Sequence, residues 1–248
     1  MTRFRPLLLT AALALTALAP VAQAQTPAFN DMQRRAIEEV VRDYLVKHPE
    51  VIMEAIEELQ KRERAETAER QKTALSGNKQ KIFQDPASPV GGNPQGDVTV
   101  VEFFDYQCGY CKAVTGDVAT LLKTDGKVRF VYKEFPILGP ASVTAAKAAL
   151  AARAQGKYEA LHNALMANKG QLDDAKIFQI AAGAGLDVDK LKKDMATPDV
   201  EQAIGANHAL AEALGIRGTP AFVVGNELVP GAIKLDEMKK LVALARKG

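Results

Sequence analysis

The sequence predicts an α/β fold in which helices pack on a central sheet. Three observations support this fold class. Residues 98–135 have the pattern strand, helix, strand; residues 140–214 are rich in alanine with helical periodicity; and a hairpin followed by a helix closes the chain. Strands interleaved with helices are typical of α/β domains. The chain that precedes this region has a different composition, and we expect it to form a separate helical part.

The first 24 residues have the pattern of a signal peptide. Arg3 and Arg5 are followed by an apolar stretch at 7–18 and by the small-residue sequence Ala22-Gln23-Ala24. The apolar stretch is too short to span a bilayer comfortably, so we expect cleavage after Ala24 and export to the periplasm or an equivalent space. Removing Arg3 and Arg5 from 32 basic residues leaves 30 against 30 acidic ones. This balance gives no electrostatic reason to expect nucleic acid as a partner.

Residues 25–75 are expected to form a helical arm and linker. From Asp31 to about Lys72 the chain is highly charged and lacks glycine, and His48-Pro49 separates two helical stretches. Each stretch carries an apolar stripe, formed by Ile37, Val40, Val41, Tyr44 and Leu45, and by Ile52, Ala55, Ile56 and Leu59. Two short helices cannot bury these stripes alone. Either the stripes dock on the main domain or several copies pack together, and exposed apolar surface favours self-association.

Residues 76–248 are expected to form the main domain. Residues 76–97 are rich in turn residues and predict loops around one short strand at 81–84. A buried strand at 98–104 runs into the two cysteines of the chain, and a helix at 112–123 and a second strand at 128–135 follow. The sequence has no internal repeats.

The second half of this domain predicts a helical insertion at about 140–214. Breaks at Gly156, 169–170, 183–185 and Pro198 suggest about four helices. Residues 221–224 and 227–229 predict a hairpin that turns at Gly225-Asn226, and a closing helix is expected at 234–246.

Cys108 and Cys111 are the only cysteines of the chain and form a C-x-x-C motif. In an exported protein this pattern favours thiol–disulfide exchange. A strand that leads directly into a helix places Cys108 at the helix N-terminus, where backbone N–H groups and the helix dipole favour the thiolate. We expect Cys108 to be the exposed nucleophile and Cys111 to attack the mixed disulfide. Gly109 and Tyr110 carry no positive charge that would stabilise the thiolate further, so the sequence does not determine how strong an oxidant the disulfide is.

Other uses of the motif are less favoured. A structural disulfide would close a very small loop and contribute little entropic stabilisation. Zinc would need two more ligands, and His48, His162 and His208 are far apart in the sequence. We therefore expect no resident metal or other cofactor beyond a redox-active Cys108–Cys111 disulfide, although two thiolates could hold Cu(I).

Thr219-Pro220 follows a glycine-rich turn at 215–218. Alone it would be an ordinary turn proline, but together with the upstream C-x-x-C it resembles the thioredoxin superfamily. In that superfamily a cis-proline loop faces the active-site cysteines and presents backbone to the substrate chain. The resemblance implies a thioredoxin fold with Thr219 and Pro220 beside the sulfurs, binding substrate together with Gly109 and Tyr110.

Further residues narrow the resemblance. Residues 101–107, Val-Glu-Phe-Phe-Asp-Tyr-Gln, and the helical insertion resemble the disulfide-bond oxidoreductase A (DsbA) family. Residues 85–89, 92–94 and the arm segment 45–51 are similar to the DsbA-like group that includes suppressor of copper sensitivity protein C (ScsC). This resemblance covers essentially the whole mature chain. It implies that the N-terminal helices are an oligomerisation arm, and it favours a trimer.

Glu102 lies six residues before Cys108, where this family carries a buried acid. On an apolar strand its carboxyl would have a raised pKa and could exchange a proton with Cys111. The alternative is that Glu102 points to solvent. Lys133, in the next strand, either pairs with Glu102 or is solvated, and the second case is more usual. Asp105 and Tyr106 are expected to be structural.

The predicted function is that of a periplasmic thiol–disulfide oxidoreductase acting on protein clients with cysteines. An isomerase or reductase is favoured, because an oligomer can hold non-native clients and Thr219 before the proline is similar to isomerase-type enzymes. A DsbA-like oxidase is the alternative, because the core resembles those enzymes. In either case a membrane redox partner would reset the cysteines. A copper-binding or chaperone-type protein without turnover is an alternative of another class.

Overall fold

The computed structural model describes residues 29–247, so the predicted signal peptide lies outside the described residues. The chain divides into two compact units, one that ends at Gln60 and one that begins at Lys61. Within residues 29–247, no helix combines the length and the apolar character that a membrane span requires.

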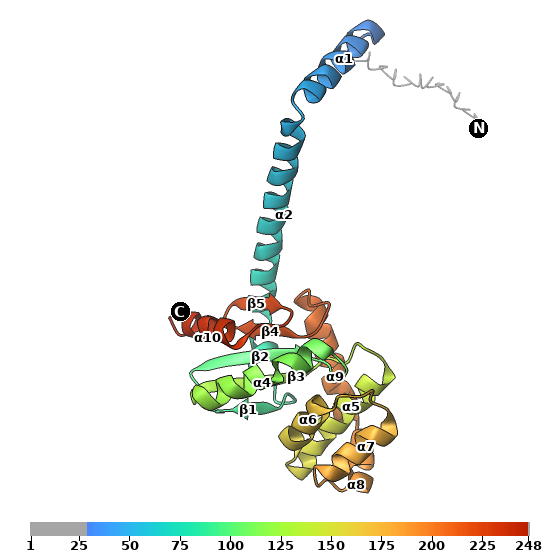
Figure 1. The fold of residues 1–248 in the computed structure, drawn as a ribbon, viewed down its shortest axis with the longest axis vertical. Coiled ribbons are helices and arrows are strands. Elements are labelled where there is room, and N and C mark those ends of the chain that lie inside the picture. Colours follow the sequence, from blue (N-terminus) through green and yellow to red (C-terminus); the bar gives the residue numbers. More distant parts are fainter. Residues whose placement is uncertain (1–28, 248) are drawn as a thin grey trace, which may run out of the picture. The chain divides into compact units, whose positions relative to one another are not determined.

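The first unit consists of helix α1 (Asp31–Lys47) and the beginning of helix α2 (Glu50–Gly77) (Figure 1). A capping box starts α1, since the side chain of Asn30 accepts a hydrogen bond from the Gln33 amide and the Gln33 side chain accepts one from the Asn30 amide. The helix ends at Lys47, which confirms the predicted break at His48-Pro49.

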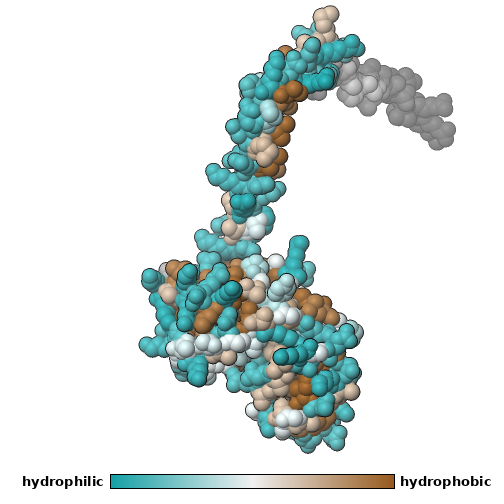
Figure 2. All heavy atoms as spheres, in the orientation of Figure 1, coloured by the Kyte–Doolittle hydropathy of each residue, from teal (hydrophilic) through white to brown (hydrophobic). Residues whose placement is uncertain are grey.

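One side of these helices is apolar and uncovered within the unit, as Figure 2 shows by the brown atoms along them. We define the arm stripe as Ile37, Val40, Val41, Tyr44, Ile52, Ile56 and Leu59, whose exposed fractions lie between 41% and 68%. Helices gain most of their stability by packing an apolar face against other residues. The stability of these two helices therefore depends on whatever covers the arm stripe, because the arm does not bury it.

The second unit is built on a five-stranded sheet with the order β1-β3-β2-β4-β5. The central strands β2 (Val98–Phe104) and β3 (Val128–Glu134) run parallel, with Val98 beside Val128 and Phe104 beside Glu134. Their nearly continuous apolar sequence is typical of strands that are covered on both faces. The remaining pairs are antiparallel and involve β1 (Val90–Gly92), β4 (Ala221–Val224) and β5 (Glu227–Pro230). The strands predicted at 98–104 and 128–135 and the β4–β5 hairpin are thus confirmed.

Helices cover both faces of the sheet (Figure 1). Helix α4 (Gly109–Thr124) joins β2 to β3, and helix α10 (Leu235–Ala245) ends the chain. The predicted insertion contains five α-helices rather than about four, because each of the four predicted breaks separates two of them. They are α5 (Pro140–Ala151), which continues into a 3₁₀ turn (Ala152–Gln155), α6 (Tyr158–Ala167), α7 (Asp174–Gly183), α8 (Val188–Met195) and α9 (Pro198–Ala213).

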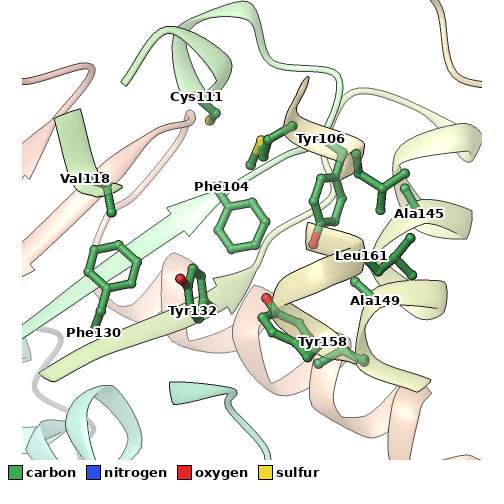
Figure 3. Close-up of a cluster of buried hydrophobic side chains, with 14 of the residues drawn as sticks. Phe104, Tyr106, Cys111, Val118, Phe130, Tyr132, Ala145, Ala149, Tyr158 and Leu161 are labelled. Carbon is green, nitrogen blue, oxygen red and sulfur yellow. The ribbon is translucent and has the colours of Figure 1, made fainter. Parts of the chain in front are cut away.

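Two apolar cores result, one on each face of the sheet. The first contains side chains of α4, α10 and most of the insertion, packed against Phe104, Phe130 and Phe222 (Figure 3). The second contains Leu75 from the end of α2 and part of α9, packed against Phe103 and other side chains of the opposite face. The α/β fold class is therefore confirmed.

The strand predicted at residues 81–84 is wrong. These residues lie in and just after the short helix α3 (Lys79–Phe83), and the amide of Ile82 donates to the carbonyl of Asn78. Ile82 is completely buried in the second core. A run of two apolar residues has no period that distinguishes a helical turn from a strand. The packing of Ile82 against the sheet, which is a tertiary contact, decided the outcome.

Candidate redox site

The C-x-x-C motif lies where β2 ends and α4 begins. Cys108 is the N-cap residue of α4, with extended backbone angles (φ −72°, ψ 115°). Its amide donates to the carbonyl of Asp105 at 3.1 Å, which closes a turn, and its carbonyl accepts from the Lys112 amide at 3.1 Å. Cys108 therefore lies at the N-terminus of α4, at the positive end of the helix dipole, although its side chain makes no capping hydrogen bond.

Both thiols are free, and they differ in accessibility. Cys111 is completely buried, whereas Cys108 is 6% exposed. The expectation of an exposed Cys108 is therefore wrong in degree, although Cys108 is the more accessible of the two. The reason is that the loop before β4 covers it, with the Cys108 thiol donating to the Thr219 carbonyl at 3.2 Å. Tyr110, by contrast, is 72% exposed beside the motif.

The loop before β4 carries Thr219 and Pro220, and the peptide bond between them is cis, as the resemblance implied. The carbonyl of Pro220 accepts from the Gly231 amide at 2.8 Å, which ties the loop to the end of the hairpin. The structure thus brings Thr219 and Pro220 to the C-x-x-C motif from more than 100 residues away. Gly109, the residue after Cys108, is exposed. The role of these residues in substrate binding stays a prediction.

Glu102 is buried on β2, so the alternative that it points to solvent is wrong. Burial raises the pKa of its carboxyl to about 8, and negative charge on Cys108 acts in the same direction. Burial likewise raises the pKa of Cys111, and the charge of Glu102 adds to this effect. The two groups are therefore close enough for the charge of one to disfavour ionisation of the other. The part that Glu102 plays in proton transfer stays a prediction.

Lys133 neither pairs with Glu102 nor is solvated, so both sequence-based interpretations are wrong. In the β2–β3 register Glu102 lies beside Tyr132, and Lys133 lies one position further on, beside Phe103. Successive side chains point to opposite faces of a sheet, so Lys133 and Glu102 face different cores. The Lys133 ammonium is buried and donates to the Asp85 carboxylate and to the Lys81 carbonyl, both at 2.8 Å.

Asp105 connects the cysteine turn to the loop after β3. Its buried carboxylate accepts from the amides of Gln107, Ile137 and Leu138 and from the hydroxyl of Ser142, at 2.7–2.9 Å. These four hydrogen bonds fix the backbone three residues before Cys108. Asp105 is therefore structural, as predicted, and no hydrogen-bonding capacity is left over for substrate.

Glu134 at the end of β3 received no role from the sequence. It is buried, and its Oε1 atom accepts hydrogen bonds from the hydroxyls of Tyr106 at 2.9 Å and Tyr158 at 2.8 Å. The Nδ1 atom of His162 lies 3.1 Å from the Tyr106 hydroxyl. The period of two along β3 was a usable signal, because it places Glu134 on the same face as Phe130 and Tyr132.

Comparison with known proteins agrees with this geometry. The family described as "DSBA-like thioredoxin domain" matches residues 99–243, more than half of the chain. The chain therefore belongs to the DsbA-like family of thioredoxin-fold proteins. A second family, described as "Copper resistance protein ScsC N-terminal domain", matches residues 33–66. The combination identifies the chain as a DsbA-like protein of the ScsC type.

Solved structures support this assignment. A thioredoxin-like oxidoreductase from Silicibacter pomeroyi is 50% identical, with a TM-score of 0.68 over 69% of this chain and 99% of that chain. A linker-deletion mutant of ScsC from Proteus mirabilis is 29% identical, with a TM-score of 0.67 over 89% of this chain and 98% of that chain.

Among curated proteins, the antiporter NhaA 1 of Salinispora arenicola is 30% identical over 64% of this chain and 25% of the antiporter. The chain thus spans about a quarter of the length of the curated relatives that it matches.

Proposed function

We propose that this protein catalyses thiol–disulfide exchange on exported protein clients, with Cys108 as the nucleophile and Cys111 as the resolving thiol. One observation carries the proposal. The Cys108 sulfur lies at the N-terminus of α4 against the Thr219 carbonyl, and Cys111 is buried one turn further along the same helix. This arrangement offers one thiol to a partner and protects the other.

Exchange begins when the Cys108 thiolate attacks one sulfur of a client disulfide. A disulfide forms between Cys108 and the client, and the second client sulfur leaves as a thiolate. Gly109, Tyr110, Thr219 and Pro220 border the reacting sulfur and would contact the client chain. To reach Cys108, the client must displace the hydrogen bond between the Cys108 sulfur and the Thr219 carbonyl.

Resolution requires a thiolate at Cys111, whose pKa is raised by burial. The carboxylate of Glu102, with a pKa of about 8, is the base that accepts this proton. The Cys111 thiolate then attacks Cys108, the client sulfur leaves, and the client gains two thiols while Cys108 and Cys111 become a disulfide. Oxidation is the reverse sequence. In isomerisation the client thiolate itself attacks the mixed disulfide, with no net redox change.

An isomerase or reductase is the favoured direction, and a DsbA-like oxidase is the alternative. The uncovered arm stripe supports self-association, with a trimer as the favoured state, and an assembly would set several Cys108 sites around one client. The signal-peptide pattern supports a periplasmic location, where a membrane redox partner would reset the cysteines. The formal charge near zero of the predicted mature chain gives no electrostatic reason to expect nucleic acid as a partner.

Two substitutions test the proposal. The Cys108→Ala variant should lose exchange with scrambled ribonuclease, and the Cys111→Ala variant should accumulate mixed disulfides with clients that reducing agent releases. Full exchange by Cys108→Ala would exclude the mechanism. Reactivation of scrambled ribonuclease that depends on residues 25–72 supports the isomerase. Oxidation of reduced ribonuclease without reshuffling of scrambled ribonuclease supports the oxidase.

A Cu(I)-binding role is the second candidate, and the match of residues 33–66 to a copper resistance protein domain favours it. The thiolates of Cys108 and Cys111, three positions apart in the sequence, are soft ligands that suit Cu(I). In residues 29–247 no cluster of three or more His, Cys, Asp or Glu side chains could hold a metal ion. Competition with a Cu(I) chelator tests this candidate: stoichiometric uptake without any disulfide exchange would favour the binding protein.

A further inference from the structure

A second buried acid lies on the Cys111 side of the sheet. Glu134 projects from the same face of the sheet as Glu102, because Phe104 lies beside Glu134 and Glu102 lies beside Tyr132 in the parallel register. From the strand spacing and the rise per residue, the Cα atoms of the two glutamates lie about 8 Å apart. Both carboxyls enter the core that also contains Cys108 and Cys111.

Glu134 is tied to the cysteine turn through Tyr106. The Tyr106 hydroxyl donates to the Oε1 atom of Glu134, and its ring is completely buried against Phe104. Tyr106 lies inside the turn that the hydrogen bond from the Cys108 amide to the Asp105 carbonyl closes. Holding the Tyr106 ring therefore holds the backbone that presents the Cys108 sulfur.

The hydrogen bonds of Glu134 are unevenly distributed. Oε1 accepts from Tyr106 and from Tyr158, whereas Oε2 is buried without a hydrogen-bond partner among residues 29–247. A buried carboxylate with one unpaired oxygen is poorly stabilised as an anion. Burial raises the pKa of Glu134 to about 8, the value that burial also gives Glu102. Two such acids in one apolar core disfavour a charge on each other.

We propose that Glu134 is a positioning residue of the redox site, which holds the Cys108 turn through Tyr106 and competes with Glu102 for the negative charge that this buried core can accommodate. The inference rests on the proposed function, because it concerns the acid that takes the proton of Cys111. When Glu134 is ionised, Glu102 holds its proton more tightly and is a less available base. When Glu134 is neutral, Glu102 is free to ionise.

Among residues 29–247, the other groups that face Glu134 do not supply a compensating positive charge. Burial lowers the pKa of His162 to about 3, so its imidazole is neutral. Burial raises the pKa of each of the three surrounding tyrosines, so they are neutral as well. The titratable groups packed around this pair are Tyr106, Tyr132, Tyr158, His162, Asp105, Cys108 and Cys111, whereas the exposed Glu159 acts on Tyr132 and not on either glutamate.

Carboxyl titration of the reduced protein tests the competition. The ¹³C carboxyl signals of labelled glutamates are followed against pH, with the Glu102 signal assigned from Glu102→Gln. In the wild type we expect two coupled steps shared by Glu102 and Glu134. In Glu134→Gln we expect a single Glu102 step whose midpoint lies about one pH unit or more below the later wild-type step. The matched control Glu159→Gln removes a surface charge next to Tyr158 and should leave both steps in place.

Alkylation of Cys108 tests the positioning role separately, at a pH where both acids are neutral. At pH 6 Glu134→Gln keeps an oxygen acceptor for Tyr106 and should alkylate at the wild-type rate. Tyr106→Phe loses the hydroxyl and should alkylate about fivefold faster, because one buried hydrogen bond no longer holds the turn closed. Circular dichroism and the urea midpoint establish that each variant is folded.

The outcomes separate the two proposals. A Glu102 midpoint that is identical in the wild type and Glu134→Gln overturns the competition, and an unchanged alkylation rate in Tyr106→Phe overturns the positioning role. Neither result touches the proposed function, which stands or falls with the dependence of wild-type exchange on Cys108. Absence of exchange in the wild type would overturn the proposed function, while the titration would still report on the two carboxyls.

Discussion

The sulfur of Cys108 lies 3.2 Å from the carbonyl oxygen of Thr219, although the two residues are 111 positions apart. A thiol can donate to this oxygen, whereas a thiolate cannot, so this hydrogen bond belongs to the reduced, protonated site. A positive charge placed next to the sulfur would attract a thiolate directly.

Tyr110→His should make the protein a stronger oxidant. Position 110 is 72% exposed next to Cys108, so an imidazole fits there without repacking, and its protonated form stabilises the thiolate of the reduced state. A stabilisation of about 1 kcal/mol corresponds to a rise of roughly 20 mV in reduction potential. Equilibration with glutathione at pH 6 and pH 8 measures this rise, which should be larger at pH 6. Tyr110→Gln is the neutral control, and an equal rise in that variant would contradict the explanation.

Glu102→Gln should flatten the pH dependence of stability of the reduced protein. The folded-state pKa of Glu102 is about 8 against 4.5 for an unperturbed group, so the folded state binds the extra proton between these values. The free energy of unfolding therefore falls as pH rises through this window, by up to about 1.4 kcal/mol per pH unit for one carboxyl. Urea unfolding between pH 5 and pH 9 measures the slope. A slope in Glu102→Gln equal to that of the wild type would contradict the raised pKa.

Asp85→Asn should destabilise the protein more than Lys133→Met. The first change leaves the buried ammonium of Lys133 without its anion and should lower the free energy of unfolding by about 3 kcal/mol. The second leaves the carboxylate of Asp85, whose side chain is 22% exposed, and should cost about 1 kcal/mol. A urea-unfolding double-mutant cycle at pH 7 measures both losses, and additive effects would contradict direct pairing.

The Lys133–Asp85 ion pair also predicts that the free energy of unfolding falls at low pH. Burial alone would raise the pKa of Asp85, but hydrogen bonds from Lys133 and Ser88 lower it below 3.8. The stabilisation is therefore present above pH 3.8 and is lost as pH falls through the folded-state pKa. The stability difference between the wild type and Asp85→Asn should accordingly shrink in acid, measured by urea unfolding below pH 4.

Val41→Glu should reduce the oligomeric mass. Val41 lies in the arm stripe and is 50% exposed, and a carboxylate there would have to be buried in any interface that the stripe forms. Val46 is 72% exposed on another side of α1, so Val46→Glu is the matched control. Light scattering on the mature protein measures the mass. A lower mass for both variants, or for neither, would argue against the stripe as the contact surface.

Much of the fold could be predicted because it depends on local patterns. Strands β2 and β3 have continuous apolar sequences, Gly225-Asn226 marks a tight hairpin, and Gly156 and Pro198 interrupt helices. The segment at 81–84 was misassigned because it is too short to show a period. Its helical form follows from the burial of Ile82 in the second core.

The candidate site was predictable only where the residue type itself is informative. Two cysteines at C-x-x-C spacing indicate their chemistry from the sequence, and a proline after a glycine-rich turn gains meaning next to them. Glu134 and Lys133 are ordinary charged residues at the end of a strand, and the period of two puts them on opposite faces without naming a partner for either. The pairing register sends one to the Cys111 side and the other to Asp85.

The amino-acid order by itself determined which atoms can react, where the strands and most helices form, and that the N-terminal helices carry an apolar stripe, because these properties depend on residue type and short-range spacing. The tertiary structure alone decided how far Cys108 is covered, which carboxyls are buried without charge compensation, and where the ammonium of Lys133 finds its anion. These properties depend on contacts between segments dozens of residues apart, and a one-residue change of strand register would reverse them.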